Sequence, residues 1–176
     1  ELMDHGPIVA SAKFKMQNLK YGYPELHDKL AKLGAELLIE TLPKWIQGEI
    51  ASVLQDHEQA TFSKILKKED GRIDWTKSAE EIERQIRAFT PWPGAWTEWA
   101  QKDRPYRIRI DEAQAVSEET RDGAPGFVFQ SSEHPFLVKT GKGSLAVNRL
   151  TREGSKETDT QSFLRGHTDI IGAVFH

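Results

Sequence analysis

The first hydrophobic pattern in the chain covers residues 7–16. Side chains that favour burial at Ala10, Ala12 and Phe14 alternate there with polar ones. Alternation with a period of two is typical of a β-strand with one buried face. We therefore predict a half-buried strand over residues 7–16.

A longer period follows after a loop predicted over residues 17–23. Pro24 suits the first turn of a helix, because the N–H that proline lacks has no partner at that position. Apolar residues then recur every three or four positions, which predicts a helix with one apolar face: Leu26, Leu30, Leu33, Leu37 and Ile39 or Leu42. A strand and a helix are half of an α/β layer and cannot form a sheet alone, so we expect further strands upstream.

The periodicity fades over residues 47–60, which we interpret as a linker, and a second unit is predicted over residues 61–176. Ser78 and Glu81 form an S-x-x-E capping box, in which each side chain caps the backbone N–H of the other residue. The helix that begins there must end before Pro91, because proline disfavours helical geometry in the residue before it.

The remainder of the second unit has a β pattern. Asp159 is expected to cap a short helix, and Gly141-Lys142-Gly143 suits a hairpin turn. Short strands are predicted over four ranges: 106–115, 126–130, 136–140 and 144–151. Five or so short strands with Gly-rich turns are typical of a small barrel of OB type. The predicted fold is thus an α/β fragment followed by a mostly-β, OB-like barrel domain.

The composition of the chain excludes several classes of protein. Hydrophobic residues make up 38% and charged residues 29%, cysteine is absent, and the net charge is −3. No apolar run approaches the roughly eighteen residues of a membrane span, and no export leader is evident. The absence of cysteine excludes disulfides and thiolate zinc sites, and it fits the cytoplasm. Residues 1–61 hold six basic and nine acidic residues, so the net negative charge of the chain lies in this part. A local basic face in the rest of the chain stays possible.

Several residues are candidates for chemistry, each with a structural alternative. Asp4 precedes a glycine, so its carboxylate either caps its own turn or serves as a catalytic proton acceptor. Arg84, Arg87, Arg107 and Arg109 are either a solvated face or phosphate contacts. No two of the six histidines have the i, i+4 spacing of helical ligands, so no metal site is expected, and His167 is expected to be solvated.

The segment over residues 89–96, FTPWPGAW, holds two prolines and two tryptophans. It cannot continue a helix, and we predict a rigid corner with buried rings, including that of Trp92. The alternative is an aromatic platform on which nucleic-acid bases stack.

Three segments in order resemble the methionyl-tRNA formyltransferase family. Residues 60–65 (ATFSKI), 68–75 (KEDGRIDW) and 86–95 (IRAFTPWPGA) are similar to its T-[YF]-x-x-K-[IL], D-G-x-I-D-W and I-R-A-F-N-P-W-P-G-A segments. The start of the chain, MDHGPI from Met3, resembles the family's M-D-x-G-P-I turn, and residues 150–166 resemble a segment that ends in F-L-R-G. The resemblance extends over nearly the whole chain.

The resemblance implies transfer of a formyl group from 10-formyltetrahydrofolate to the amino group of methionine on initiator tRNA. It implies a cytoplasmic monomer that uses no metal and does not bind a membrane. Residues 1–46 would be the end of the formyltransferase domain, and 61–176 the OB-like tRNA-binding domain. Asp4 would be the catalytic aspartate, with its Asn and His partners in an upstream N-x-H segment, and Arg87 and Lys156 would contact tRNA. The chain opens on Glu1 and not on methionine, so we expect it to be cut from a longer protein. Because the Asn and His would lie upstream, we expect the fragment to be inactive alone.

The sequence departs from the family pattern at three positions. Thr90 replaces the usual Asn of the corner, and Ser155 and Thr158 stand where Lys and Met are usual.

Two alternative functions remain. One is another formyltransferase-type enzyme, which acts on a sugar nucleotide or on formyl-folate as a hydrolase or dehydrogenase. The other is a non-catalytic OB-type RNA-binding module. The corner and the F-L-R-G segment favour the tRNA enzyme, and the Asp4 turn argues against the module.

Overall fold

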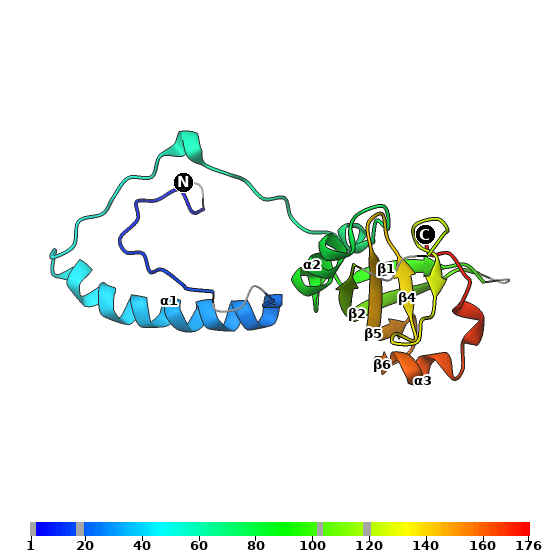
Figure 1. Cartoon of the computed structure of the whole chain (residues 1–176). Coiled ribbons are helices and arrows are strands. Elements are labelled where there is room, and N and C mark those ends of the chain that lie inside the picture. The colour runs from blue at the N-terminus through cyan, green and yellow to red at the C-terminus, as the bar shows by residue number, and fades with distance from the viewer. Residues whose placement is uncertain (1–2, 17–19, 102–103, 118–120) are drawn as a thin grey trace. The chain divides into compact units, whose positions relative to one another are not determined.

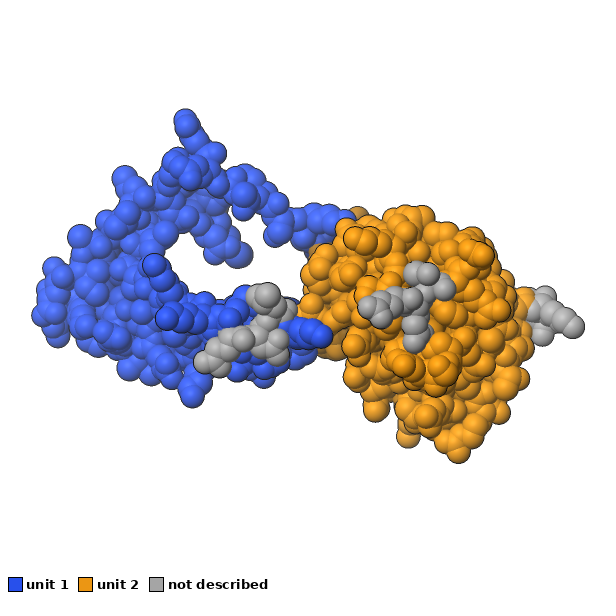
Figure 2. Space-filling view, viewed as in Figure 1, with its two compact units in different colours: residues 1–65 blue, residues 66–176 orange. Residues whose placement is uncertain are grey.

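The computed structural model describes residues 3–16, 20–101, 104–117 and 121–176 (Figure 1). The chain forms two compact units, residues 1–65 and 66–176, which Figure 2 colours separately. Part of the loop predicted over residues 17–23 lies outside the described residues. Within the described ranges, no helix is long and apolar enough to cross a membrane.

The first unit contains one long helix, α1 (Tyr23–Ile46), and a short 3-10 turn, η1 (His57–Gln59). The start of α1, with Pro24 in its first turn, is as predicted. Its apolar face has formed, but none of the described residues in this unit is buried. Leu38 is 60% exposed, so the face contributes little of the stability that burial would give.

The strand predicted over residues 7–16 is not formed. The backbone groups of Ile8 and Val53 exchange two hydrogen bonds of 2.8 Å, and this isolated antiparallel bridge is the extent of β pairing among the described residues of the segment. A strand needs a neighbour along its length to satisfy its backbone N–H and C=O groups. The alternating sequence has no such neighbour in the first unit.

The second unit is built on a six-stranded antiparallel sheet. The strand order is β1-β2-β5-β4-β3, and β6 also pairs with β5 (Figure 1). The strands are β1 (Ala95–Trp99), β2 (Tyr106–Val116), β3 (Val128–Phe129), β4 (Leu137–Lys139), β5 (Ser144–Arg152) and β6 (Thr158–Asp159). The four predicted strands are confirmed as β2, β3, β4 and β5. No strand was predicted at β1, because four of its five residues are buried and the strand therefore shows no alternation.

The helices of the second unit begin at the predicted caps. Helix α2 (Ala79–Phe89) opens with the Ser78–Glu81 box, in which the Ser78 N–H donates to the Glu81 carboxylate over 3.0 Å. It ends two residues before Pro91, as predicted. Helix α3 (Thr160–Leu164) is capped by Asp159, and two 3-10 turns, η2 (Lys68–Gly71) and η3 (Thr168–Ile170), complete the unit.

One hydrophobic core holds this unit together. Ile82 and Ile86 of α2 pack against the face of the sheet that carries Ile108, Ile110 and Leu150. Large rings from other segments close this core: Trp75, Trp99, Phe136, Phe163 and Phe175. The second unit therefore has the buried apolar surface that the first unit lacks.

Two expectations about side chains were wrong. Trp92 is 54% exposed, because the corner places its ring on the outside, whereas the Trp99 ring enters the core. His167 is half-buried and not freely solvated: its ring stacks on Phe163 with centroids 4.4 Å apart, and Nε2 lies 3.1 Å from a guanidinium nitrogen of Arg152. The exposure of Trp92 leaves the base-stacking alternative open.

Replacing the two tryptophans separates a buried ring from an exposed one. Trp99→Ala should lower the free energy of unfolding by about 3–5 kcal/mol, because it empties a site in the core. Trp92→Ala should cost less than about 1 kcal/mol, as is usual for exposed positions. Urea unfolding of both variants checks this, and equal losses would contradict the burial difference.

The capping box predicts a dependence of stability on acid. Hydrogen bonds from the Ser78 hydroxyl and then from its backbone N–H lower the pKa of Glu81. A carboxylate with a lowered folded-state pKa stabilises the protein above its ordinary pKa, and that contribution is lost as the pH falls through the lowered value. Glu81→Gln keeps a box-forming residue that does not titrate. The free energy of unfolding of Glu81→Gln should fall less steeply below pH 4.5 than that of the parent. If the two proteins lose stability equally as the pH falls, the titration of Glu81 is not the cause.

Candidate active-site turn and nucleic-acid surface

Asp4 lies in a tight turn at the start of the described chain. Its φ angle is 63°, in the left-handed region, and it is the one described non-glycine residue with a positive φ. Aspartate tolerates this region better than most residues, because its short side chain bonds locally. The Asp4 side chain is exposed, so the carboxylate is accessible to a reactant.

The segment after α1 holds this turn. The side-chain amide nitrogen Nε2 of Gln55 donates to the carbonyl oxygen of Asp4 over 2.9 Å and to that of Gly6 over 2.7 Å. The antiparallel Ile8–Val53 bridge joins the same two segments, two residues after Gly6 in one and two residues before Gln55 in the other. Residues 47–60 are therefore more than a spacer, because part of this range is bonded to the turn that carries Asp4.

Two hollows of the first unit meet at Asp4. One, of about 550 Å³, lies between the turn and α1, where Gly34 and Leu37 form part of its wall. The other, of about 690 Å³, is lined by the turn and by residues around η1, including His57 and Phe62. Asp4 thus lines both hollows.

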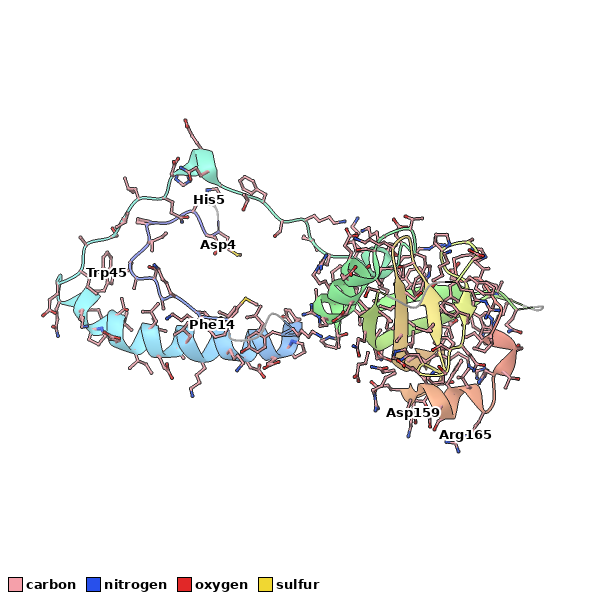
Figure 3. The ribbon with its side chains drawn as sticks, in the orientation of Figure 1. Asp4, His5, Phe14, Trp45, Asp159 and Arg165 are labelled. Carbon is pink, nitrogen blue, oxygen red and sulfur yellow. The ribbon has the colours of Figure 1, made fainter. Side chains whose placement is uncertain are left out.

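Two imidazole rings lie beside each other at the Asp4 turn. His5 follows Asp4 in the turn (Figure 3), and its ring stacks on His57 with centroids 5.5 Å apart. His5 also lies 6.3 Å from the ring of Phe62. Among the described residues, no group of three His, Cys, Asp or Glu side chains is arranged to hold a metal ion.

The two predicted tRNA contacts lie on different elements of the second unit. Arg87 is on α2, with its side chain 25% exposed and its Nε 3.7 Å from the carboxylate of Glu83. Lys156 is exposed in the turn between β5 and β6. The Glu83 carboxylate offsets the attraction of Arg87 for a phosphate, and Lys156 is the more exposed of the two. Arg84 on the same helix is also exposed.

The outer face of β1 and β2 carries arginines arranged around an indole ring. The guanidinium carbon of Arg107 lies 3.8 Å from the ring centroid of Trp96, and that of Arg72 lies 5.8 Å from it. The Trp96 side chain is held in place, because its Nε1–H donates a hydrogen bond to the Lys68 carbonyl oxygen over 2.9 Å. A guanidinium stacked on an aromatic ring is partly ordered before a ligand arrives. The sequence did not reveal this group, since Arg72 is far from Arg107 along the chain.

Arg109 is engaged within the protein. Its Nε lies 2.5 Å from the Asp111 carboxylate, which also accepts from the Thr151 hydroxyl over 2.6 Å. Arg109 lines a cleft of about 330 Å³ beside the corner, together with Arg149, which is paired with Glu157. Both arginines of this cleft are therefore paired with carboxylates, and Arg107 is the better placed of the β2 arginines to meet an anion.

These features define an α-helical segment with a carboxylate-bearing turn, followed by an antiparallel-sheet domain with outward-facing cations. Residues 65–168, more than half of the chain, match the family described as "Formyl transferase, C-terminal domain". The chain belongs to this family.

Curated methionyl-tRNA formyltransferases are similar over nearly the whole chain. That of Chloroflexus aggregans is 43% identical over 166 residues, which cover 93% of this chain and 52% of the relative. Those of Myxococcus xanthus and Carboxydothermus hydrogenoformans are each 38% identical, covering 95% and 99% of this chain and 51% and 55% of the relatives. The resemblance that the motifs predicted is confirmed as homology. The chain spans about half the length of these relatives.

Solved structures share the fold. HypX from Aquifex aeolicus, in a variant form, matches 97% of this chain and 30% of its own, with a TM-score of 0.67 and 19% identity. HypX in complex with tetrahydrofolic acid matches 93% of this chain and 28% of its own, with a TM-score of 0.65. At this identity the likeness concerns the fold alone.

Proposed function

We propose that this chain is the C-terminal part of an enzyme that formylates the amino group of methionine on initiator tRNA. The donor is 10-formyltetrahydrofolate, and the enzyme acts as a cytoplasmic monomer without a metal. The observation that carries the proposal is 38–43% identity, over nearly the whole chain, to enzymes of that name. The HypX complex with tetrahydrofolic acid is consistent with a folate donor in this fold. Because the chain spans about half of its relatives, catalysis requires an upstream formyltransferase domain.

Asp4 supplies one of three roles in the proposed reaction. The neutral amine attacks the formyl carbon, and negative charge develops on the formyl oxygen. Collapse of this tetrahedral intermediate breaks the bond between the formyl carbon and N10 of the folate, and N10 takes up a proton as tetrahydrofolate leaves. In the upstream N-x-H segment, the Asn amide and the His ring stabilise that oxyanion. The Asp4 carboxylate sets the charge of the histidine or accepts the proton that the amine releases. The exposed position of Asp4 on a bonded turn supports this role.

The proposed OB-like barrel is supported by the C-terminal segment. The backbones of Glu98 at the end of β1 and His176 exchange two hydrogen bonds of 3.1 Å. Val128 of β3 donates to the Ala173 carbonyl and accepts from Gly172, each over 2.8 Å. Residues 172–176 therefore bond to both β1 and β3, the two ends of the strand order, as closure of a barrel would require.

The second unit is proposed to hold tRNA through its phosphates. Exposed cations at Lys156 and Arg107, with Arg87 as a weaker contributor, give contacts that do not read bases. Selection of initiator tRNA then belongs to the upstream domain, near the reacting amine. Affinity for tRNA separates this function from a sugar-nucleotide or formyl-folate enzyme, and dependence on Asp4 separates it from a non-catalytic RNA-binding module.

Asp4→Ala tests the catalytic role in the full-length enzyme. Loss of a positioned proton acceptor should lower kcat by about 10²–10⁴-fold while the protein stays folded. Asp28→Ala, an exposed aspartate on α1, is the matched control and should retain parental kcat. Single-turnover formylation measures both, and a kcat within about tenfold of the parent for Asp4→Ala would remove Asp4 from the mechanism.

Salt titrations test the phosphate contacts. Each cation that releases a counterion contributes about one unit to the slope of log affinity against log salt. Arg87→Ala with Lys156→Ala should lower the slope by up to about two units, and Arg107→Ala by about one, equally for initiator and elongator tRNA. Lys44→Ala on α1 is the control. Unchanged slopes would mean that these cations form a solvated face and do not contact phosphates. Lost discrimination between initiator and elongator tRNA would mean that the second unit recognises more than phosphates.

A further inference from the structure

We propose that Gln55 is a positioning residue for the Asp4 carboxylate. This inference rests on the proposed function, because it gives Gln55 a part in the same formyl transfer. Gln55 lies nine residues after α1, in a segment without regular secondary structure, and its side chain is half-buried against the turn. The amide holds the backbone on both sides of His5, and so fixes where the neighbouring side chain of Asp4 points.

The geometry uses the donor capacity of the Gln55 amide in full. A primary amide nitrogen carries two N–H groups, and Nε2 of Gln55 has two carbonyl acceptors, those of Asp4 and Gly6, at 2.9 and 2.7 Å. The acceptors are two residues apart, so both must turn inward to reach one nitrogen. The bonds therefore stabilise the tight path of the chain from Asp4 to Gly6.

The conformation of Asp4 needs such support. A φ of 63° is unfavourable for a residue with a Cβ atom, although aspartate adopts it more readily than most. No described residue in this unit is buried, so packing does not hold the turn in place. The Gln55 bonds and the Ile8–Val53 pair hold it with polar interactions instead.

A small change in this turn has a large effect on a proton-transfer group. Displacing a catalytic group by about 1 Å can cost on the order of 10²-fold in rate. The Gln55 amide donates to backbone oxygens of the turn and not to the Asp4 carboxylate, among the described contacts. Its loss should therefore reduce the rate of the chemical step and leave tRNA binding, which we assign to the second unit, unchanged.

Gln55→Glu is the sharpest variant, because it preserves size and removes the donors. An ionised carboxylate only accepts hydrogen bonds, so it would face the two carbonyl oxygens without a proton. Gln59→Glu is the matched control on the same segment. The Gln59 amide donates over 2.7 Å to the Asp56 carboxylate and, among the described residues, not to the Asp4 turn.

The experiment measures kcat, and KM for initiator tRNA, in the full-length enzyme. Gln55→Glu should lower kcat by about 10²-fold with KM within about twofold of the parent, whereas Gln59→Glu should keep kcat within about threefold. The kcat ratio of Gln55→Glu to parent should rise as the pH falls, because the introduced carboxyl regains a donor when it is protonated. Near-parental kcat for Gln55→Glu, an equal loss in Gln59→Glu, or a ratio independent of pH would each overturn the inference.

A second measurement does not depend on activity. In ¹⁵N–¹H spectra of the 176-residue chain, Gln55→Glu should shift the amide signals of His5 and Gly6, and Gln59→Glu should leave them in place. Unchanged signals in Gln55→Glu would show that the side chain does not hold the turn. If the parent enzyme does not formylate methionyl-tRNA, the proposed function fails, and these spectra still decide whether Gln55 fixes the turn.

Discussion

The burial of apolar side chains in one unit and not in the other governs the behaviour of this chain. Among the described residues, those that are buried all lie at Gly71 or beyond it, and they form the core between α2 and the sheet. Burial of apolar surface is the main favourable term in folding. Residues 66–176 therefore have the means to fold alone, whereas residues 1–65 have an amphipathic helix whose apolar face, within the described part of the chain, meets no core.

The same division explains how each candidate site is held. In the second unit, cations project from strands whose other face is packed, and Arg107 is ordered further by the ring of Trp96. In the first unit, the Asp4 turn depends on hydrogen bonds from Gln55 and on the Ile8–Val53 pair. A site held by a few polar bonds is sensitive to the loss of any one of them, which a packed scaffold is not. The proposed enzyme thus combines a robust binding surface with a turn that needs support from a distant segment.

Local patterns predicted the elements whose stability is decided locally. The Ser78–Glu81 box fixed the start of α2, and the alternation of Arg107 and Arg109 with buried isoleucines marked β2. Local patterns failed where the outcome depends on neighbours. Residues 7–16 alternate as a strand does, yet no adjacent strand pairs with them, and β1 is buried on both faces and hides its period.

The residues of the candidate sites also divide into those that the sequence predicted and those that it did not. Asp4, Arg87 and Lys156 were predicted because the motifs of a family mark them, and their proposed roles still rest on that homology. Two features were not predicted: the bonds from Gln55 to the Asp4 turn, and the approach of Arg72 to the Trp96 ring that Arg107 also covers. Gln55 lies 51 positions from Asp4, and Arg72 lies 24 positions from Trp96. Such contacts depend on the path of the whole chain, and no local signal in one sequence records them.

The most direct test of the account compares tRNA binding by residues 66–176 with binding by the whole chain. If the second unit folds alone and holds tRNA through its own cations, the two affinities should agree within about threefold at the same salt concentration, with the same salt slope. A shorter piece that is folded, as judged by a cooperative melting transition, but binds tRNA more than about tenfold more weakly would contradict the account, because the contacts would then lie in residues 1–65.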